Sequence, residues 1–221
     1  GSVGTAVFFA GLHGVTGEAA WKDAALGALS DVRALIAGDA GARPADLGAC
    51  SGLGSIVYGL VVAGGLLGDA TLLDDAAAVA ARLTTVQIGE DRSYDVTSGA
   101  AGAILGLLAL HHHRPDRTWL TLAQACGDHL VGSQTPMPAG GGWIVRKGRP
   151  MAGFAHGCAG IATALLRLAA ATGEERYVAG AERALAYERG LFAPELGNWP
   201  VIGSLDARTG SGFSVMTAWC H

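Results

Sequence analysis

Gly99-Ala100-Ala101-Gly102, followed by the apolar run Ala103-Ile104-Leu105-Gly106-Leu107-Leu108, is the stretch of sequence that decides the fold. Four such stretches occur, and in each a pair of small residues three positions apart leads into an apolar run. The last glycines of the four motifs are Gly4, Gly54, Gly102 and Gly160, so successive motifs are 50, 48 and 58 residues apart. Repeats of this length are typical of stacked helical pairs.

An amphipathic segment follows each apolar run after a short polar turn. Residues 72–83 carry an apolar stripe at helical spacing, and residues 179–189 carry another. The second segment combines the apolar Ala181, Ala184 and Leu185 with a polar face of Glu182, Arg183, Glu188 and Arg189. Each repeat is therefore predicted to be a helical hairpin, with one helix buried on all sides and one half-exposed, and no strand-like alternation competes.

Such hairpins can stack as an open solenoid or close into a double-layered ring. The glycines favour the ring, because they allow the inner helices to approach one another closely at one end. We therefore predict an all-α fold, an α/α toroid of two-helix repeats, present here as a partial toroid of about four repeats with the active site where the inner helices start. Cys220-His221 resembles the opening of a fifth motif, so residues 1–221 are expected to be one domain that is cut at both ends.

Composition and charge further restrict the class of protein and its partners. Half of the 221 residues are apolar, the net charge is −4 and no basic run occurs, so no nucleic-acid partner is expected. The uncharged stretch between Asp46 and Asp69 is long enough to span a membrane, but it is rich in glycine and lacks basic flanks, so a buried helix is expected instead. No signal peptide is recognised, and we expect reduced thiols in a cytoplasmic protein, with Cys50, Cys126 and Cys158 in the core.

Polar residues gather just before the glycine motifs. By the register of the repeat, Ser98, His156 and His221 are equivalent, and Thr97, Ala155 and Cys220 are the equivalent residues one position earlier. A carboxylate, an imidazole and a thiol thus recur at one end of neighbouring inner helices, from Asp95, His156 and Cys220.

The motifs around these residues resemble those of lanthionine synthetase C-like (LanC-like) cyclases. Asp95 stands in Tyr-Asp-Val-x-x-Gly-x-x-Gly, His156 in Gly-Phe-Ala-His-Gly-x-x-Gly-Ile and Cys220 in Ala-Trp-Cys-His. The segment Phe192-Ala193-Pro194-Glu195-Leu196-Gly197-Asn198-Trp199-Pro200 is similar to a stretch found in the bifunctional, class II synthetases. The resemblance covers the whole chain, with the motifs in the family's order and spacing.

This resemblance implies a toroid that binds one Zn²⁺ through two cysteines and one histidine. The metal would activate a cysteine thiol of a ribosomal precursor peptide, which adds to dehydroalanine or dehydrobutyrine and closes a thioether ring. It implies that Cys220 is a zinc ligand, with the remaining cysteine and histidine ligands downstream of residue 221, so that this chain alone is expected to be inactive. It also implies a fused N-terminal dehydratase domain as a partner.

The resemblance leaves two roles for each of the other site residues. His156 is expected to be a catalytic acid or to stabilise the enolate, and Asp95 either orients a histidine or takes the thiol proton. Two alternatives to the cyclase are a non-catalytic peptide- or thiol-binding module and an α/α-toroid carbohydrate-active enzyme. The latter would need a pair of carboxylates flanking the substrate, and no such pair is evident.

Overall fold

Four inner helices begin at the predicted glycine motifs. The computed structural model describes residues 1–38, 46–146 and 149–199 of the chain. Within these residues the inner helices are α1 (Ser2–Thr16), α4 (Leu53–Leu67), α7 (Ala100–His113) and α9 (Cys158–Thr172). Each starts within two residues of its predicted position, which confirms the repeat.

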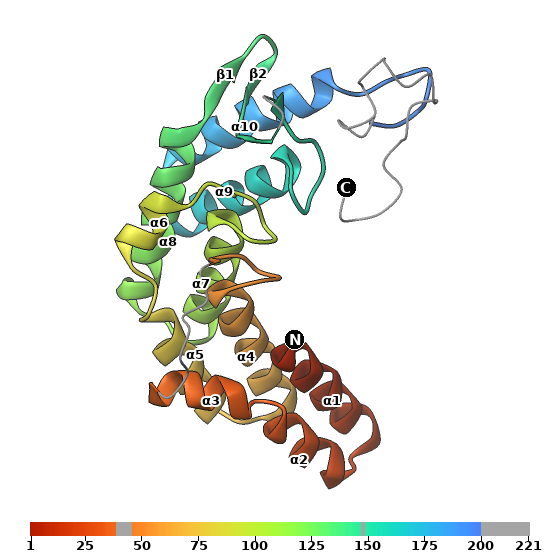
Figure 1. The fold of residues 1–221 in the computed structure, drawn as a ribbon, viewed down its shortest axis with the longest axis vertical. Helices are drawn as coiled ribbons and strands as arrows, with labels where there is room; N and C mark the ends of the chain where they lie inside the picture. The colour runs from red at the N-terminus through yellow and green to blue at the C-terminus, as the bar shows by residue number, and fades with distance from the viewer. Residues whose placement is uncertain (39–45, 147–148, 200–221) are drawn as a thin grey trace.

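Outer helices complete the repeats and make a second layer. They are α2 (Ala19–Gly27), α3 (Ser30–Ala37), α5 (Thr71–Ala80), α6 (Thr85–Glu90), α8 (Arg117–Ser133) and α10 (Glu175–Gly190). Successive inner helices pack against one another, and each also packs against an outer helix of its own repeat. The two layers form the curved arc seen in Figure 1, with the inner helices on its concave side. The all-α toroidal class is therefore confirmed.

Two short hairpins account for the longest repeat. Strand β1 (Thr135–Met137) pairs antiparallel with β2 (Gly140–Gly142), with Thr135 opposite Gly142. Strand β3 (Ile144–Arg146) pairs antiparallel with β4 (Arg149–Pro150). These strands lie between α8 and α9, where the motif spacing is 58 residues, and β2 packs against α10.

The inner helices are less buried than predicted. In α4, Val57, Leu60 and Val61 are buried, but the Tyr58 side chain is 49% exposed. In α1 only Ala6 and Ala10 are buried, and Phe8 is 62% exposed. The prediction of inner helices buried on all sides is therefore wrong. The departure is greatest for α1, because this helix lies at one end of the arc and packs against α2 and α4. No helix among the described residues is long and apolar enough to cross a membrane.

Close backbone approach explains the glycines of the central motifs. A Cβ atom on Gly102 would overlap the carbonyl oxygen of Val96 and the backbone nitrogen of Ala49. One on Gly160 would overlap the carbonyl oxygen of Phe154. At Gly4, by contrast, an added Cβ would meet no atom within 4 Å. The close backbone approach predicted for the motif glycines therefore occurs at the starts of α7 and α9 but not at the start of α1.

Replacing Gly102 with alanine should destabilise the fold, because the backbone atoms that the methyl group meets cannot move aside easily. We expect a loss of about 1–3 kcal/mol. Gly65→Ala is the matched control within an inner helix, since Gly65 is exposed and its added Cβ would meet nothing within 4 Å. That change should stabilise α4 by up to about 1 kcal/mol. Thermal unfolding followed by circular dichroism measures both, and equal midpoints for the two variants would contradict the packing argument.

Candidate active site

Three loops lie edge to edge where the inner helices start. The loop before α4 donates to the loop before α7: the backbone N–H groups of Cys50 and Ser51 both donate to the carbonyl oxygen of Thr97, at 3.0 Å. The loop before α7 donates in turn to the loop before α9. Thr97 donates to the carbonyl oxygen of Ala155 through its backbone nitrogen at 3.2 Å and through its hydroxyl at 3.1 Å. Thr97 and Ala155, which are equivalent in the repeat, are thereby held in contact.

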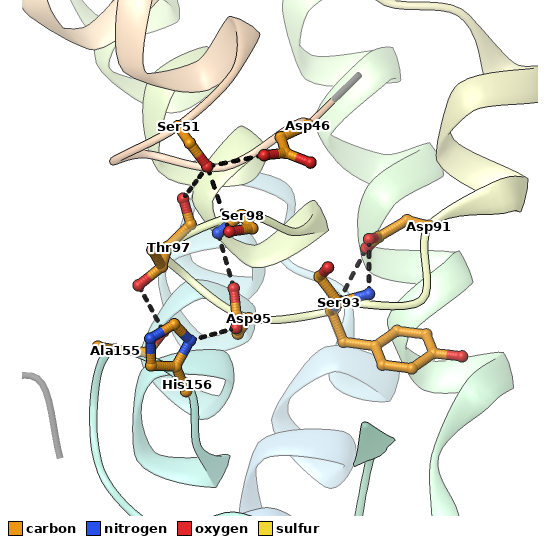
Figure 2. A network of polar contacts seen from close by, with 10 residues as sticks. Asp46, Ser51, Asp91, Ser93, Asp95, Thr97, Ser98, Ala155 and His156 are labelled. Atoms are coloured by element: carbon orange, nitrogen blue, oxygen red, sulfur yellow. Dashed lines mark hydrogen bonds and ion pairs between the residues drawn. The ribbon is translucent and has the colours of Figure 1, made fainter. Parts of the chain in front are cut away.

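The side chains of Asp95 and His156 meet where the loop before α7 contacts the loop before α9. Nδ1 of His156 lies 2.6 Å from Oδ2 of Asp95, while the other oxygen, Oδ1, accepts the backbone N–H of Ser98 at 2.7 Å (Figure 2). Asp95 is buried, whereas the His156 side chain is 43% exposed. An ionised carboxylate can only accept hydrogen bonds, so Nδ1 carries the proton and Nε2 is the basic nitrogen of the neutral ring. The structure therefore brings two of the three predicted site residues together.

A chain of polar side chains supports the loop of Asp95 from the other side. The hydroxyl of Ser51 lies 3.0 Å from Oδ2 of Asp46 and 3.2 Å from the hydroxyl of Ser98 (Figure 2). Ser98 also holds Asp95 through its backbone nitrogen. The loop before α4 thus contributes to the position of a carboxylate in the next repeat.

Asp91, which no sequence motif indicated, accepts hydrogen bonds from both ends of the loop that contains Asp95. Its Oδ2 accepts the backbone N–H of Tyr94 at 3.1 Å and that of Ala100, the first residue of α7, at 2.9 Å. Its Oδ1 accepts the N–H of Ser93 at 2.9 Å. An aspartate just before a polar turn is a common local signal, but the spacing of nine residues to Ala100 follows no recognised helix cap.

Glu188 has the same arrangement in the loop of His156. Its Oε1 accepts the backbone N–H of Gly153 and its Oε2 that of Ala159, the second residue of α9, both at 2.8 Å. The sequence placed Glu188 on the polar face of its helix, and this prediction is wrong: only 8% of the residue is exposed. The end of α10 lies beneath the loop, a contact that helical periodicity does not encode. Burial raises the pKa of the Glu188 carboxyl, and the two donated N–H groups oppose the rise.

The tryptophan of the class II-like segment also packs at this point. The indole Nε1 of Trp199 donates to the carbonyl oxygen of Glu188 at 2.8 Å. The ring of Phe192 meets that of Trp199 edge to face, with 4.8 Å between ring centroids. The segment is therefore anchored to the end of α10, next to the residue that holds the His156 loop.

Cys220, the predicted metal ligand, has no position in the described structure. Cys220, and His221 beside it, lie outside the described residues. Among the residues that the structure does describe, no group of three or more His, Cys, Asp or Glu side chains could hold a metal ion. The described residues thus do not make a zinc site by themselves, and the role of Cys220 stays a prediction.

The other cysteines divide into two kinds. Cys126 and Cys158 are buried, as predicted, and burial raises the pKa of both thiols, that of Cys158 to about 12. The prediction that Cys50 is in the core is wrong, since it is exposed in the loop before α4. Cys50 is equivalent to His156 in the repeat, and like that residue it lies in the loop before an inner helix rather than within the helix.

The arc of helical hairpins and the carboxylate–imidazole pair at its inner end define an all-α toroid protein with a candidate active site. The family model for lanthionine synthetase C-like proteins matches residues 1–221, the whole of the chain. The chain therefore belongs to the lanthionine synthetase C-like family. A search of curated proteins found no match.

Thiol labelling tests the burial of the cysteines. At pH 8 iodoacetamide should modify Cys50 quickly and leave Cys158 and Cys126 intact. A thiol with a pKa near 12 carries a roughly 1,000-fold smaller thiolate fraction than an ordinary one, and its burial blocks access as well. Peptide mapping by mass spectrometry gives the rate at each site, and denaturant should expose all of them. Labelling of Cys158 at the rate of Cys50 in the native protein would contradict the structure.

Proposed function

We propose that this protein is a zinc-dependent cyclase that forms lanthionine or methyllanthionine rings in a dehydrated ribosomal precursor peptide. The observation that carries the proposal is the hydrogen bond between Asp95 and His156, made between two repeats at the inner end of the toroid. Membership of the family supports this class of reaction. The proposed partners are the precursor peptide and a fused dehydratase domain, and the proposed compartment is the cytoplasm.

The reaction joins a cysteine sulfur to a dehydro residue. The thiol loses its proton, the thiolate sulfur forms a bond to the β-carbon, and the electrons of the carbon–carbon double bond move onto the enolate. The enolate then takes a proton at its α-carbon, which balances the proton lost by the thiol. The chain must therefore supply a group that donates or holds a proton near the enolate.

His156 is suited to that step. The half-exposed ring can reach a bound peptide, and its Nε2 can take up a proton and return it. A protonated ring would also stabilise the negative charge of the enolate through a charge-assisted hydrogen bond. We assign proton donation to the α-carbon to this residue.

Asp95 is better suited to orienting the ring than to taking the thiol proton. It is buried, and each of its oxygens already accepts a hydrogen bond, one from Ser98 and one from His156. A general base needs an open path to the proton that it removes. Of the two roles that the sequence left open, the geometry favours the one in which Asp95 fixes the tautomer and direction of His156.

Cys220 is proposed as a zinc ligand on the basis of motif and register. It is equivalent in the repeat to Thr97 and Ala155, which contact each other through backbone hydrogen bonds. The remaining cysteine and histidine ligands are proposed to follow residue 221. When bound, zinc supplies deprotonation of the substrate thiol, because a coordinating thiol is held as the thiolate. The described residues contribute the proton-transfer pair.

Two substitutions in the full-length protein separate metal binding from proton transfer. Cys220→Ala should abolish both zinc retention and ring closure and leave the helix content nearly unchanged. His156→Ala should retain zinc and reduce the rate of cyclisation by about 10²–10⁴-fold. Elemental analysis measures the zinc, and free-thiol counting on a dehydrated peptide measures ring closure.

His112→Ala provides the matched control, since this exposed histidine lies at the opposite end of an inner helix and should be neutral. Full zinc occupancy and normal ring closure in Cys220→Ala would exclude the proposed metal role. A wild-type protein that binds the peptide without closing rings would instead be a peptide-binding module.

A further inference from the structure

We propose that Glu188 and Asp91 are positioning residues, whose carboxylates hold the two site loops so that His156 and Asp95 meet in one geometry. The proposal rests on the proposed function for its kinetic consequences. Neither carboxylate contacts the imidazole ring in the structure. Each acts on the backbone that carries a site residue.

Glu188 joins the beginning and the end of the loop that contains His156. Its two oxygens accept from Gly153, three residues before the histidine, and from Ala159, three residues after it. Gly153 has a φ of 99°, which residues with a side chain rarely adopt, so this end of the loop turns sharply. The adjacent Tyr187 donates its hydroxyl to the carbonyl oxygen of Pro150 at 3.0 Å, and α10 thereby fixes the approach to the same loop.

Asp91 repeats this arrangement around Asp95. One oxygen accepts from Tyr94, directly before Asp95, and from Ala100 at the start of α7. Tyr94 has a φ of 60°, an uncommon value for a residue other than glycine. Its ring stacks on His129 of α8 with 5.5 Å between centroids, and Nε2 of His129 lies 3.0 Å from the carbonyl oxygen of Asp91. The outer layer thus supports the N-terminal end of this loop through His129.

The chemistry calls for a carboxylate at each position. Backbone N–H groups at a helix start have no partner within the helix, and a buried N–H without an acceptor costs about 1–3 kcal/mol. A carboxylate offers two acceptors, whereas a carboxamide offers one acceptor and turns an NH₂ group toward the second N–H. Glu188→Gln therefore keeps the volume of the side chain but releases one end of the loop. The released end is three residues from His156.

The test replaces Glu188 with its amide in the full-length protein, as Glu188→Gln, and removes the Asp91 carboxylate, as Asp91→Ala. Alanine is used at position 91 because one amide oxygen could still accept from both Tyr94 and Ala100. Glu182→Gln is the control, because Glu182 is an exposed glutamate on the same helix as Glu188. Ring closure should fall by about 10- to 100-fold in kcat for each test variant, with KM nearly unchanged, as expected of a misplaced catalytic group. The control should behave as the wild type.

A second readout needs no activity. Histidine-selective ¹⁵N NMR reports which ring nitrogen of His156 carries the proton. The wild type should show the Nδ1–H form that the bond to Asp95 requires, and both test variants should show a mixture of tautomers. If the wild type closes no rings, the proposed function fails, while the tautomer of His156 still decides whether the carboxylates position it.

A double-mutant cycle separates positioning from general stability. In an Asp95→Asn background the pair is already broken, so Glu188→Gln should cost much less in kcat than it does in the wild type. Equal costs in the two backgrounds, together with an unchanged His156 tautomer, would overturn the proposal. Asp91 is partly exposed, so Asp91→Ala should fold even if Glu188→Gln does not. Failure of both variants to fold would assign the carboxylates to the stability of the fold and overturn the positioning role.

Discussion

Backbone contact between successive loops is the constraint on which the rest of the site depends. The loops before α4, α7 and α9 bond to one another through main-chain groups, and the inner helices that follow them can approach only where glycine omits a side chain. Gly106 of α7 supplies that space against Gly54 of α4, whereas Gly102 and Gly160 leave room for the backbone of the loops. Asp95 and His156 lie 61 residues apart in sequence, yet the contact between Thr97 and Ala155 brings their side chains within hydrogen-bonding distance.

The carboxylates at this end of the toroid have a common electrostatic role. The starts of several helices gather there, each with unpaired N–H groups and a partial positive charge. Asp91 and Glu188 accept from N–H groups at the starts of α7 and α9, and Asp95 accepts from Ser98 in the loop that leads into α7. The positive ends of α7 and α9 are therefore each bound by a carboxylate of this chain. The His156 side chain, which Asp95 holds, stays 43% exposed.

Sequence patterns predicted the features that recur in each repeat. They did not predict contacts that a residue makes with an element distant in the sequence. The glycine motifs gave the inner helix starts, and the residues before them gave the pairing of Asp95 with His156. Glu188 was assigned to a polar face because its spacing along α10 is helical, but its burial comes from a loop that precedes α9. The hairpins between residues 135 and 150 escaped detection since their strands have two or three residues each, too few for an alternating pattern.

The division of exposure between Asp95 and His156 fits a pair in which one member moves protons and the other does not. The Asp95 side chain is 6% exposed, so its bond to the ring is protected from competing water, and hydrogen bonds in such surroundings are electrostatically stronger. In the proposed reaction, the exposure of the His156 ring would let it meet a peptide and exchange a proton with water between turnovers. An exposed aspartate would orient the ring weakly, and a buried histidine could not reach a substrate. The loop contacts allow both requirements to be met, because they bury the carboxylate beneath the contact between two loops and leave the imidazole at its edge.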